Sequence, residues 1–105
     1  MSQFADVLAR LAATIEARKG ADASTSYTAQ LLANRERAAK KLGEEAIETV
    51  IAALGSDTDA LAAESGDLIY HWLVVLAAAG VSLDDVAAKL EAREGTSGLV
   101  EKASR

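Results

Sequence analysis

Five acidic residues recur at helical spacing in two neighbouring segments of the chain. The first segment carries Glu44, Glu45 and Glu48, and the second carries Glu64 and Asp67. On a helix the first three occupy roughly 100° of arc, while the last two, three residues apart, lie one above the other on a single face. If the two helices pack antiparallel through their apolar stripes, these carboxylates converge near one end of the interface.

Carboxylates brought together in this way repel one another, and each loses hydration where it is partly buried. The arrangement is favourable only if a cation lies among them. Mg²⁺ prefers octahedral oxygen ligation and keeps water molecules for substrate phosphates. It bridges phosphate oxygens and lowers the pKa of an attacking water, whose proton a free carboxylate accepts. The pattern therefore predicts a magnesium site that hydrolyses a phosphoanhydride.

A plainer interpretation exists for each of these carboxylates alone, because Glu on a soluble helix is usually solvated surface. Lys40 and Lys41 precede Glu44 and Glu45 by four residues. Such pairs also stabilise a helix by about 0.2–0.5 kcal/mol each. The combination of two acidic sets, each beside an apolar seam, favours a metal site, although spacing alone leaves both interpretations open.

The elements that position these groups are predicted to be helices. Apolar residues follow the i, i+3, i+4, i+7 pattern from Phe4 to Ile15. Longer helices are expected over 35–54 and 59–79, each followed by a glycine. A fourth begins at Ser82, which forms an approximate capping box with the residue three positions later.

No strand pattern appears, and the chain contains no proline to interrupt a helix. We therefore predict an all-α bundle of about four helices, with one domain over residues 1–94 and a loosely structured C-terminal tail over 95–105. The apolar stripe of the helix over 35–54, which includes Ile47, Val50 and Ile51, is expected to face the helix over 59–79.

Composition narrows the classes of partner. The chain has 11 basic and 16 acidic residues, a net charge of −5, which argues against a nucleic acid polymer as partner. Without cysteine it has neither disulfides nor a zinc–thiolate site. Charged residues in the first helix argue against a signal peptide. The longest apolar stretch, residues 68–79, is shorter than the ~18 residues of a membrane span. A soluble cytoplasmic protein without a membrane partner is expected.

The apolar content is mostly aliphatic and rich in alanine, with only 4% aromatic residues. Alanine favours helix but buries little area. A domain of this size buries only roughly two-thirds of its unfolded surface. We therefore expect a second subunit, in a homodimer or larger homo-oligomer, to complete the core.

The acidic motifs also carry a resemblance. Gly43-Glu44-Glu45-x-x-Glu48, followed by Glu64-x-x-Asp67, is similar to the signature of the all-α NTP pyrophosphatase (MazG-like) superfamily. More closely, the chain resembles the phosphoribosyl-ATP pyrophosphatase family of histidine biosynthesis. The segments that carry this closer resemblance are Ser26–Ala29, Lys41–Ala46, Glu64–His71, Val81–Val86 and the ending Arg93–Gly98 with Glu101–Arg105. Gly66 stands where alanine is more usual, and a proline expected before Ser26 is missing.

The resemblance implies an enzyme that hydrolyses phosphoribosyl-ATP to phosphoribosyl-AMP and pyrophosphate, the second step of histidine biosynthesis, with Mg²⁺ and as a dimer. It implies four metal ligands, a further ligand or base at Glu44, and catalytic roles shared by the first acidic set. The implied ligands are Glu45, Glu48, Glu64 and Asp67. Lys41, beside other basic residues (Arg35, Arg37 and Lys40), is expected to contact phosphates, and Ser26 and Tyr27 to contact the rest of the nucleotide.

Some alternatives stay open from the sequence. Tyr27 can also be the edge of the core, and His71, four residues after Asp67, is either a partner of that carboxylate or a packing residue. Thr96, Ser97, Gly98, Lys102 and Arg105 are candidates to close over the ribose phosphate. The chain as a whole can instead be a housekeeping nucleoside triphosphate pyrophosphatase of the same superfamily, or a helical dimerisation module without chemistry.

Overall fold

The computed structural model describes residues 3–95 and 98–103, and within them every regular element is a helix. The elements are α1 (Gln3–Ala17), α2 (Tyr27–Leu32), α3 (Arg35–Leu54), α4 (Thr58–Ala79), α5 (Leu83–Glu91) and α6 (Gly98–Ala103). The all-α prediction and its long helices are therefore confirmed. A short helix, α6, lies within the tail for which no regular structure was expected, while residues 96–97 and 104–105 of that tail lie outside the described part.

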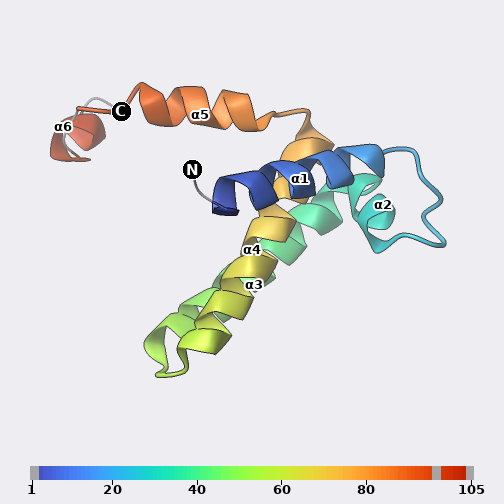
Figure 1. Cartoon of the computed structure of the whole chain (residues 1–105), viewed down its shortest axis with the longest axis horizontal. Helices are drawn as coiled ribbons and strands as arrows, with labels where there is room; N and C mark the ends of the chain where they lie inside the picture. Colours follow the sequence, from blue (N-terminus) through green and yellow to red (C-terminus); the bar gives the residue numbers. More distant parts are fainter. Residues whose placement is uncertain (1–2, 96–97, 104–105) are drawn as a thin grey trace.

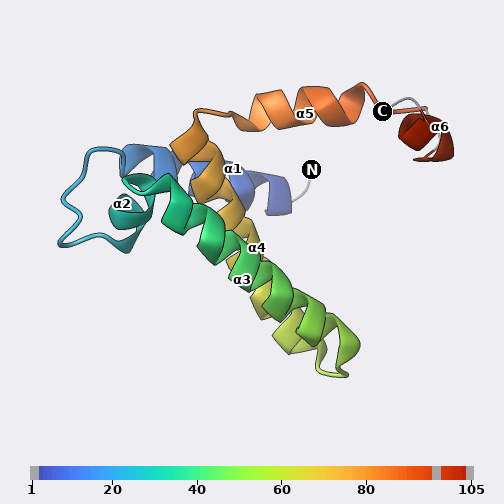
Figure 2. The same cartoon turned by 180° about the vertical axis from the view of Figure 1, so that it is seen from behind.

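The long helices α3 and α4 lie side by side as an antiparallel hairpin (Figures 1 and 2). Helices α1 and α2 pack at the end where α3 begins and α4 ends. Beyond α4 the chain turns, and after Leu83, which packs against the core, α5 and α6 extend away from the body (Figure 1). The hairpin is therefore the scaffold for both acidic segments.

Capping side chains fix where most of these helices begin. Ser82 and Asp85 form the expected capping box, each side chain bonded to the other residue's backbone N–H. The other side chains that accept a hydrogen bond from the first turn of a helix are Ser26, Asn34 and Asp57. Gly80 ends α4 in the left-handed conformation, with φ of 74°.

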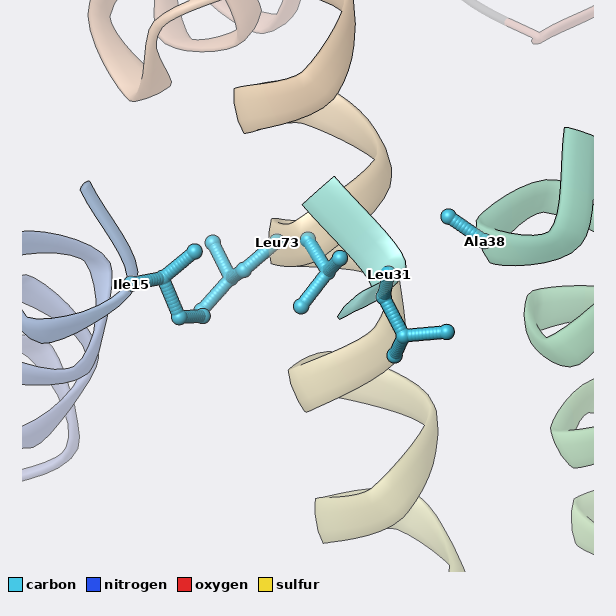
Figure 3. Packing of buried hydrophobic residues seen from close by; sticks show 5 residues of the cluster. Ile15, Leu31, Ala38 and Leu73 are labelled. Atoms are coloured by element: carbon cyan, nitrogen blue, oxygen red, sulfur yellow. The ribbon is translucent and has the colours of Figure 1, made fainter. Parts of the chain in front are cut away.

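The core is small and lies where α1, α2 and α4 meet near the start of α3. Figure 3 shows Ile15 of α1 reaching Leu73 of α4, with Leu31 of α2 lying between α4 and Ala38 of α3. Val74 completes this buried cluster. It is a thin core for a chain of this length, as the alanine content predicted.

The apolar stripe of α3 does not face α4, so the expectation that this stripe forms the seam of the hairpin was wrong. Its members are between 60% and 85% exposed; they are Ile47, Val50, Ile51 and Leu54. The opposite side of α3 faces α4 instead, where the Thr49 hydroxyl contacts the Glu64 carbonyl oxygen at 3.2 Å. Ala38, Glu45 and Thr49 are buried or half-buried on this side of α3, while the larger apolar residues of the stripe are exposed.

Helix α4 is long and apolar enough to cross a membrane by length and composition, with a mean hydropathy of 1.2 over an 18-residue window. The core helix of a soluble protein meets the same criterion, so the finding is weak evidence. In this chain α4 pairs along its length with α3 and carries Glu64 and Asp67.

Gly66 lies inside α4, where an added Cβ would meet nothing within 4 Å. We expect Gly66→Ala to raise the free energy of unfolding by about 0.5–1 kcal/mol, because alanine loses less backbone entropy in a helix. Gly80→Ala is the matched control, and it should destabilise the chain because φ at that position is 74°. Urea denaturation measures both, and a Gly66→Ala variant no more stable than the wild type would contradict the expectation.

Candidate active site

Three carboxylates from two helices converge on the α3–α4 hairpin. Oxygens of Glu45 and Glu48 on α3 and of Glu64 on α4 all lie within 4.8 Å of one another. Glu45 belongs to the buried side of α3 and is 8% exposed, Glu64 is half-buried, and Glu48 is exposed. The cluster therefore has a buried floor and a side open to solvent, where a substrate can enter.

Thr49 fixes the relative position of the two acidic segments. Its hydroxyl lies 2.8 Å from the backbone carbonyl of Glu45 and 3.2 Å from that of Glu64. One side chain thus connects the backbone beside a predicted ligand on α3 to the backbone of a predicted ligand on α4. Thr49 was not among the residues predicted for the site, because its only signal in the sequence is a threonine on the less apolar side of α3.

The charge in the cluster is unfavourable without a cation. Burial raises the pKa of Glu45, and the neighbouring carboxyls of Glu48 and Asp67 raise it further, while His71 opposes the shift. A divalent cation would remove this repulsion, and carboxylate oxygens from two rigid helices are the hard ligands that Mg²⁺ prefers. The residues present therefore fit a magnesium ion.

The raised pKa of Glu45 implies that the stability of the folded chain depends on pH. Between the ordinary and the raised pKa the folded chain binds more protons than the unfolded chain, so stability falls as pH rises through that interval. Above it, ionised Glu45 destabilises the metal-free protein. We expect Glu45→Gln to raise the melting temperature in EDTA at neutral pH and to remove any stabilisation by added Mg²⁺. A melting temperature below that of the wild type in EDTA would contradict this account.

Two of the predicted carboxylates lie outside the converging set. Glu44 is paired with Lys41 at 3.0 Å, and this hydrogen bond is the main reason why the pKa of Glu44 is lowered and that of Lys41 is raised. Asp67 is exposed on α4, one turn beyond Glu64, and close enough to Glu45 to raise its pKa. The roles assigned to Glu44 and Asp67 stay predictions.

The residues expected to bind substrate lie at the start of α2 and on α3, where Lys41 is one turn before Glu45. The Ser26 hydroxyl caps α2 by accepting from the Ala29 backbone N–H at 3.1 Å. Tyr27 is 44% exposed, and the Arg37 guanidinium carbon lies 5.8 Å from the centroid of its ring. An exposed ring with a cation over it is suited to stacking on a base. The roles of Ser26, Tyr27 and Lys41 stay predictions.

Of the tail residues considered for the ribose phosphate, Gly98 and Lys102 lie in or at the ends of α6. Thr96, Ser97 and Arg105 lie outside the described residues.

An antiparallel helical hairpin with acidic residues on its paired helices is the architecture of the all-α, MazG-like class of nucleotide pyrophosphohydrolases. Comparison with known sequences then gives the family. The phosphoribosyl-ATP pyrophosphohydrolase family matches residues 8–94. The chain belongs to this family.

Several similar proteins carry the name phosphoribosyl-ATP pyrophosphatase. The protein of that name from Caulobacter vibrioides is 73% identical over 100% of this chain and 99% of its own length. One from Parvibaculum lavamentivorans is 58% identical over 100% of this chain and 97% of its own length. Another, from Cereibacter sphaeroides, is 58% identical over 94% of this chain and 97% of its own length.

Proposed function

We propose that this chain hydrolyses phosphoribosyl-ATP to phosphoribosyl-AMP and pyrophosphate, the second step of histidine biosynthesis, in the cytoplasm. The observation that carries the proposal is the 73% identity, over the whole chain, to a protein named phosphoribosyl-ATP pyrophosphatase. The acidic cluster on the α3–α4 hairpin supports the proposal independently, because three converging carboxylates would hold a cation that assists hydrolysis of a phosphoanhydride.

In the proposed mechanism Glu45, Glu48 and Glu64 would hold Mg²⁺, together with Asp67. When bound, this ion supplies charge neutralisation at the phosphate oxygens and a more acidic water. A water oxygen forms a bond to phosphorus as the anhydride bond between the α- and β-phosphates breaks. The water proton passes to a carboxylate of the first acidic set, and pyrophosphate leaves. Glu44 is either this base or a further ligand.

The basic side chains near the cluster are suited to hold the negative charge of the substrate. The Lys41 ammonium lies 3.0 Å from the Glu44 carboxylate, on the same part of α3 as the predicted ligands. Arg37, one turn earlier, lies over the Tyr27 ring. We propose that Lys41 contacts phosphate oxygens and that Tyr27 stacks on the base or ribose, with Ser26 at the start of α2 beside it.

The active form is proposed to be a homodimer. The stripe of Ile47, Val50, Ile51 and Leu54 on α3 is exposed, and exposed apolar patches of this kind mark interfaces. The radius of gyration is 15.7 Å, against about 13 Å for a compact domain of this length. A second copy that covers the stripe would supply the missing core. Glu48 lies next to Ile47, so the acidic cluster would lie at the rim of that interface.

A panel of substrates tests the specific reaction. The purified chain is incubated with phosphoribosyl-ATP, ATP, dUTP and oxidised nucleoside triphosphates, and kcat/KM is compared by the pyrophosphate released. The proposal predicts phosphoribosyl-ATP to be the best substrate. Faster turnover of ordinary or damaged nucleotides would instead favour a housekeeping pyrophosphatase of the same superfamily.

A further inference from the structure

Helix α2 carries Tyr27 but has only six residues, so it depends on other elements for its position. Isolated helices shorter than about 12–15 residues are marginal in water. The second half of α2 is anchored by burial, because Leu31 is fully buried and lies between α4 and Ala38 of α3 (Figure 3). Tyr27, the first residue of α2, is 44% exposed, so burial does not hold this end of the helix.

Two consecutive residues of α4 contact the first two residues of α2. The hydroxyl oxygens of Tyr70 and Thr28 lie 2.5 Å apart, in a half-buried hydrogen bond that joins the two helices. The next residue, His71, lies edge-on to the Tyr27 ring, with 6.5 Å between the ring centroids. His71 is buried, and its Nδ1 lies 2.8 Å from the Asp67 backbone carbonyl oxygen, which supports its interpretation as a packing residue. The start of α2 is therefore held against α4 through Tyr70 and His71.

The Tyr27 ring lies in line with the proposed substrate-binding groups of α3. Arg37, Lys41 and Glu45 follow one another at intervals of four residues, so they share one face of this helix. Each interval is about 6 Å along the helix axis. The Arg37 guanidinium carbon lies 5.8 Å from the centroid of the Tyr27 ring, so the ring lies at the end of this row. The order suits a nucleotide, with a proposed metal ligand, a proposed phosphate contact and then an aromatic ring.

We infer that Tyr70 is a positioning residue for substrate binding: its hydroxyl, through Thr28, holds the start of α2 so that the Tyr27 ring stays where the base or ribose stacks. The inference rests on the proposed function, in which Tyr27 stacks on the substrate. Without the hydrogen bond, fewer chains have the ring in its binding position, and the apparent affinity falls by the same fraction. The predicted metal ligands lie on α3 and α4, so the chemical step does not depend on this bond.

Removal of the hydroxyl at either end of the bond tests this role. In Tyr70→Phe and in Thr28→Val, KM for phosphoribosyl-ATP should rise by about 2–10-fold, the factor that corresponds to one hydrogen bond, with kcat unchanged. Thr28→Ser keeps the hydroxyl and should stay near the wild type. The double variant should be no worse than either single variant, because both remove the same bond. Titration calorimetry with Mg²⁺ present should show the same loss of affinity for phosphoribosyl-AMP and none for pyrophosphate, which has no base.

Ile15→Val is the matched control, because it removes one methyl group from the core and leaves both hydroxyls in place. It should lower the melting temperature without changing KM. If Tyr70→Phe fails to fold, the two Thr28 variants decide. An unchanged KM in the variants that lack a hydroxyl, or equal losses of affinity for phosphoribosyl-AMP and pyrophosphate, would overturn the inference and leave the reaction in place. A wild type that does not turn over phosphoribosyl-ATP would overturn the proposed function and, with it, the role of Tyr70.

Discussion

Glu48→Gln should abolish turnover while leaving the helical fold intact. Glu48 is exposed on α3 and its carboxyl interacts with that of Glu45, so its neutral amide removes charge with little loss of packing. The change removes the negative charge of one of the three carboxylates whose oxygens lie within 4.8 Å of one another. A metal ion stabilises the transition state by several kcal/mol, so kcat should fall by about 100-fold or more. Pyrophosphate release measures kcat, and titration calorimetry with Mg²⁺ measures binding.

The matched control is Glu36→Gln, an exposed glutamate in the first turn of the same helix and outside the cluster. This variant should retain wild-type turnover and metal affinity. If Glu48→Gln also retains both, the acidic cluster is solvated surface, and the chain is better described as a dimerisation module.

Ile51→Asp should convert a dimer into monomers. Ile51 is 65% exposed on the single chain and lies in the stripe proposed to be covered by the second copy. A carboxylate buried there without a partner costs several kcal/mol, so the dimer dissociation constant should rise by about 100-fold or more. Sedimentation velocity over a range of protein concentrations measures this constant.

Ala53→Asp serves as the control, because it adds the same charge to an exposed position of α3 outside the stripe. It should leave the dimer intact. A wild-type chain that sediments as a monomer at every concentration would contradict the dimer and leave the exposed stripe without an occupant.

The sequence predicted the fold well because the signals were local. The helical pattern from Phe4 to Ile15, the glycine after each long helix and the capping box at Ser82 all depend on residues within one or two turns. The grouping of Glu45, Glu48 and Glu64 was predictable for a similar reason, since residues at helical spacing share a face and the short connection after α3 makes the two helices antiparallel neighbours.

What the sequence did not predict depends on which face of a helix meets which neighbour. The apolar stripe at Ile47 and Ile51 was predicted to contact α4. A helix can have two packing faces, however, and α3 contacts α4 through the face that carries Thr49. The same limit applies to Thr49 and to His71, whose partners are backbone carbonyl oxygens. Every residue has a backbone carbonyl group, so no sequence pattern identifies the one that accepts a given hydrogen bond.

The proposed reaction is tested first by the release of pyrophosphate from phosphoribosyl-ATP by the purified wild-type chain, with Mg²⁺ and with EDTA. We expect phosphoribosyl-AMP and pyrophosphate in equal amounts with Mg²⁺, and loss of turnover in EDTA that added Mg²⁺ restores. Folded protein that leaves phosphoribosyl-ATP intact in the presence of Mg²⁺ would contradict the proposed reaction. Turnover that persists unchanged in EDTA would contradict the role of the carboxylate cluster as a magnesium site.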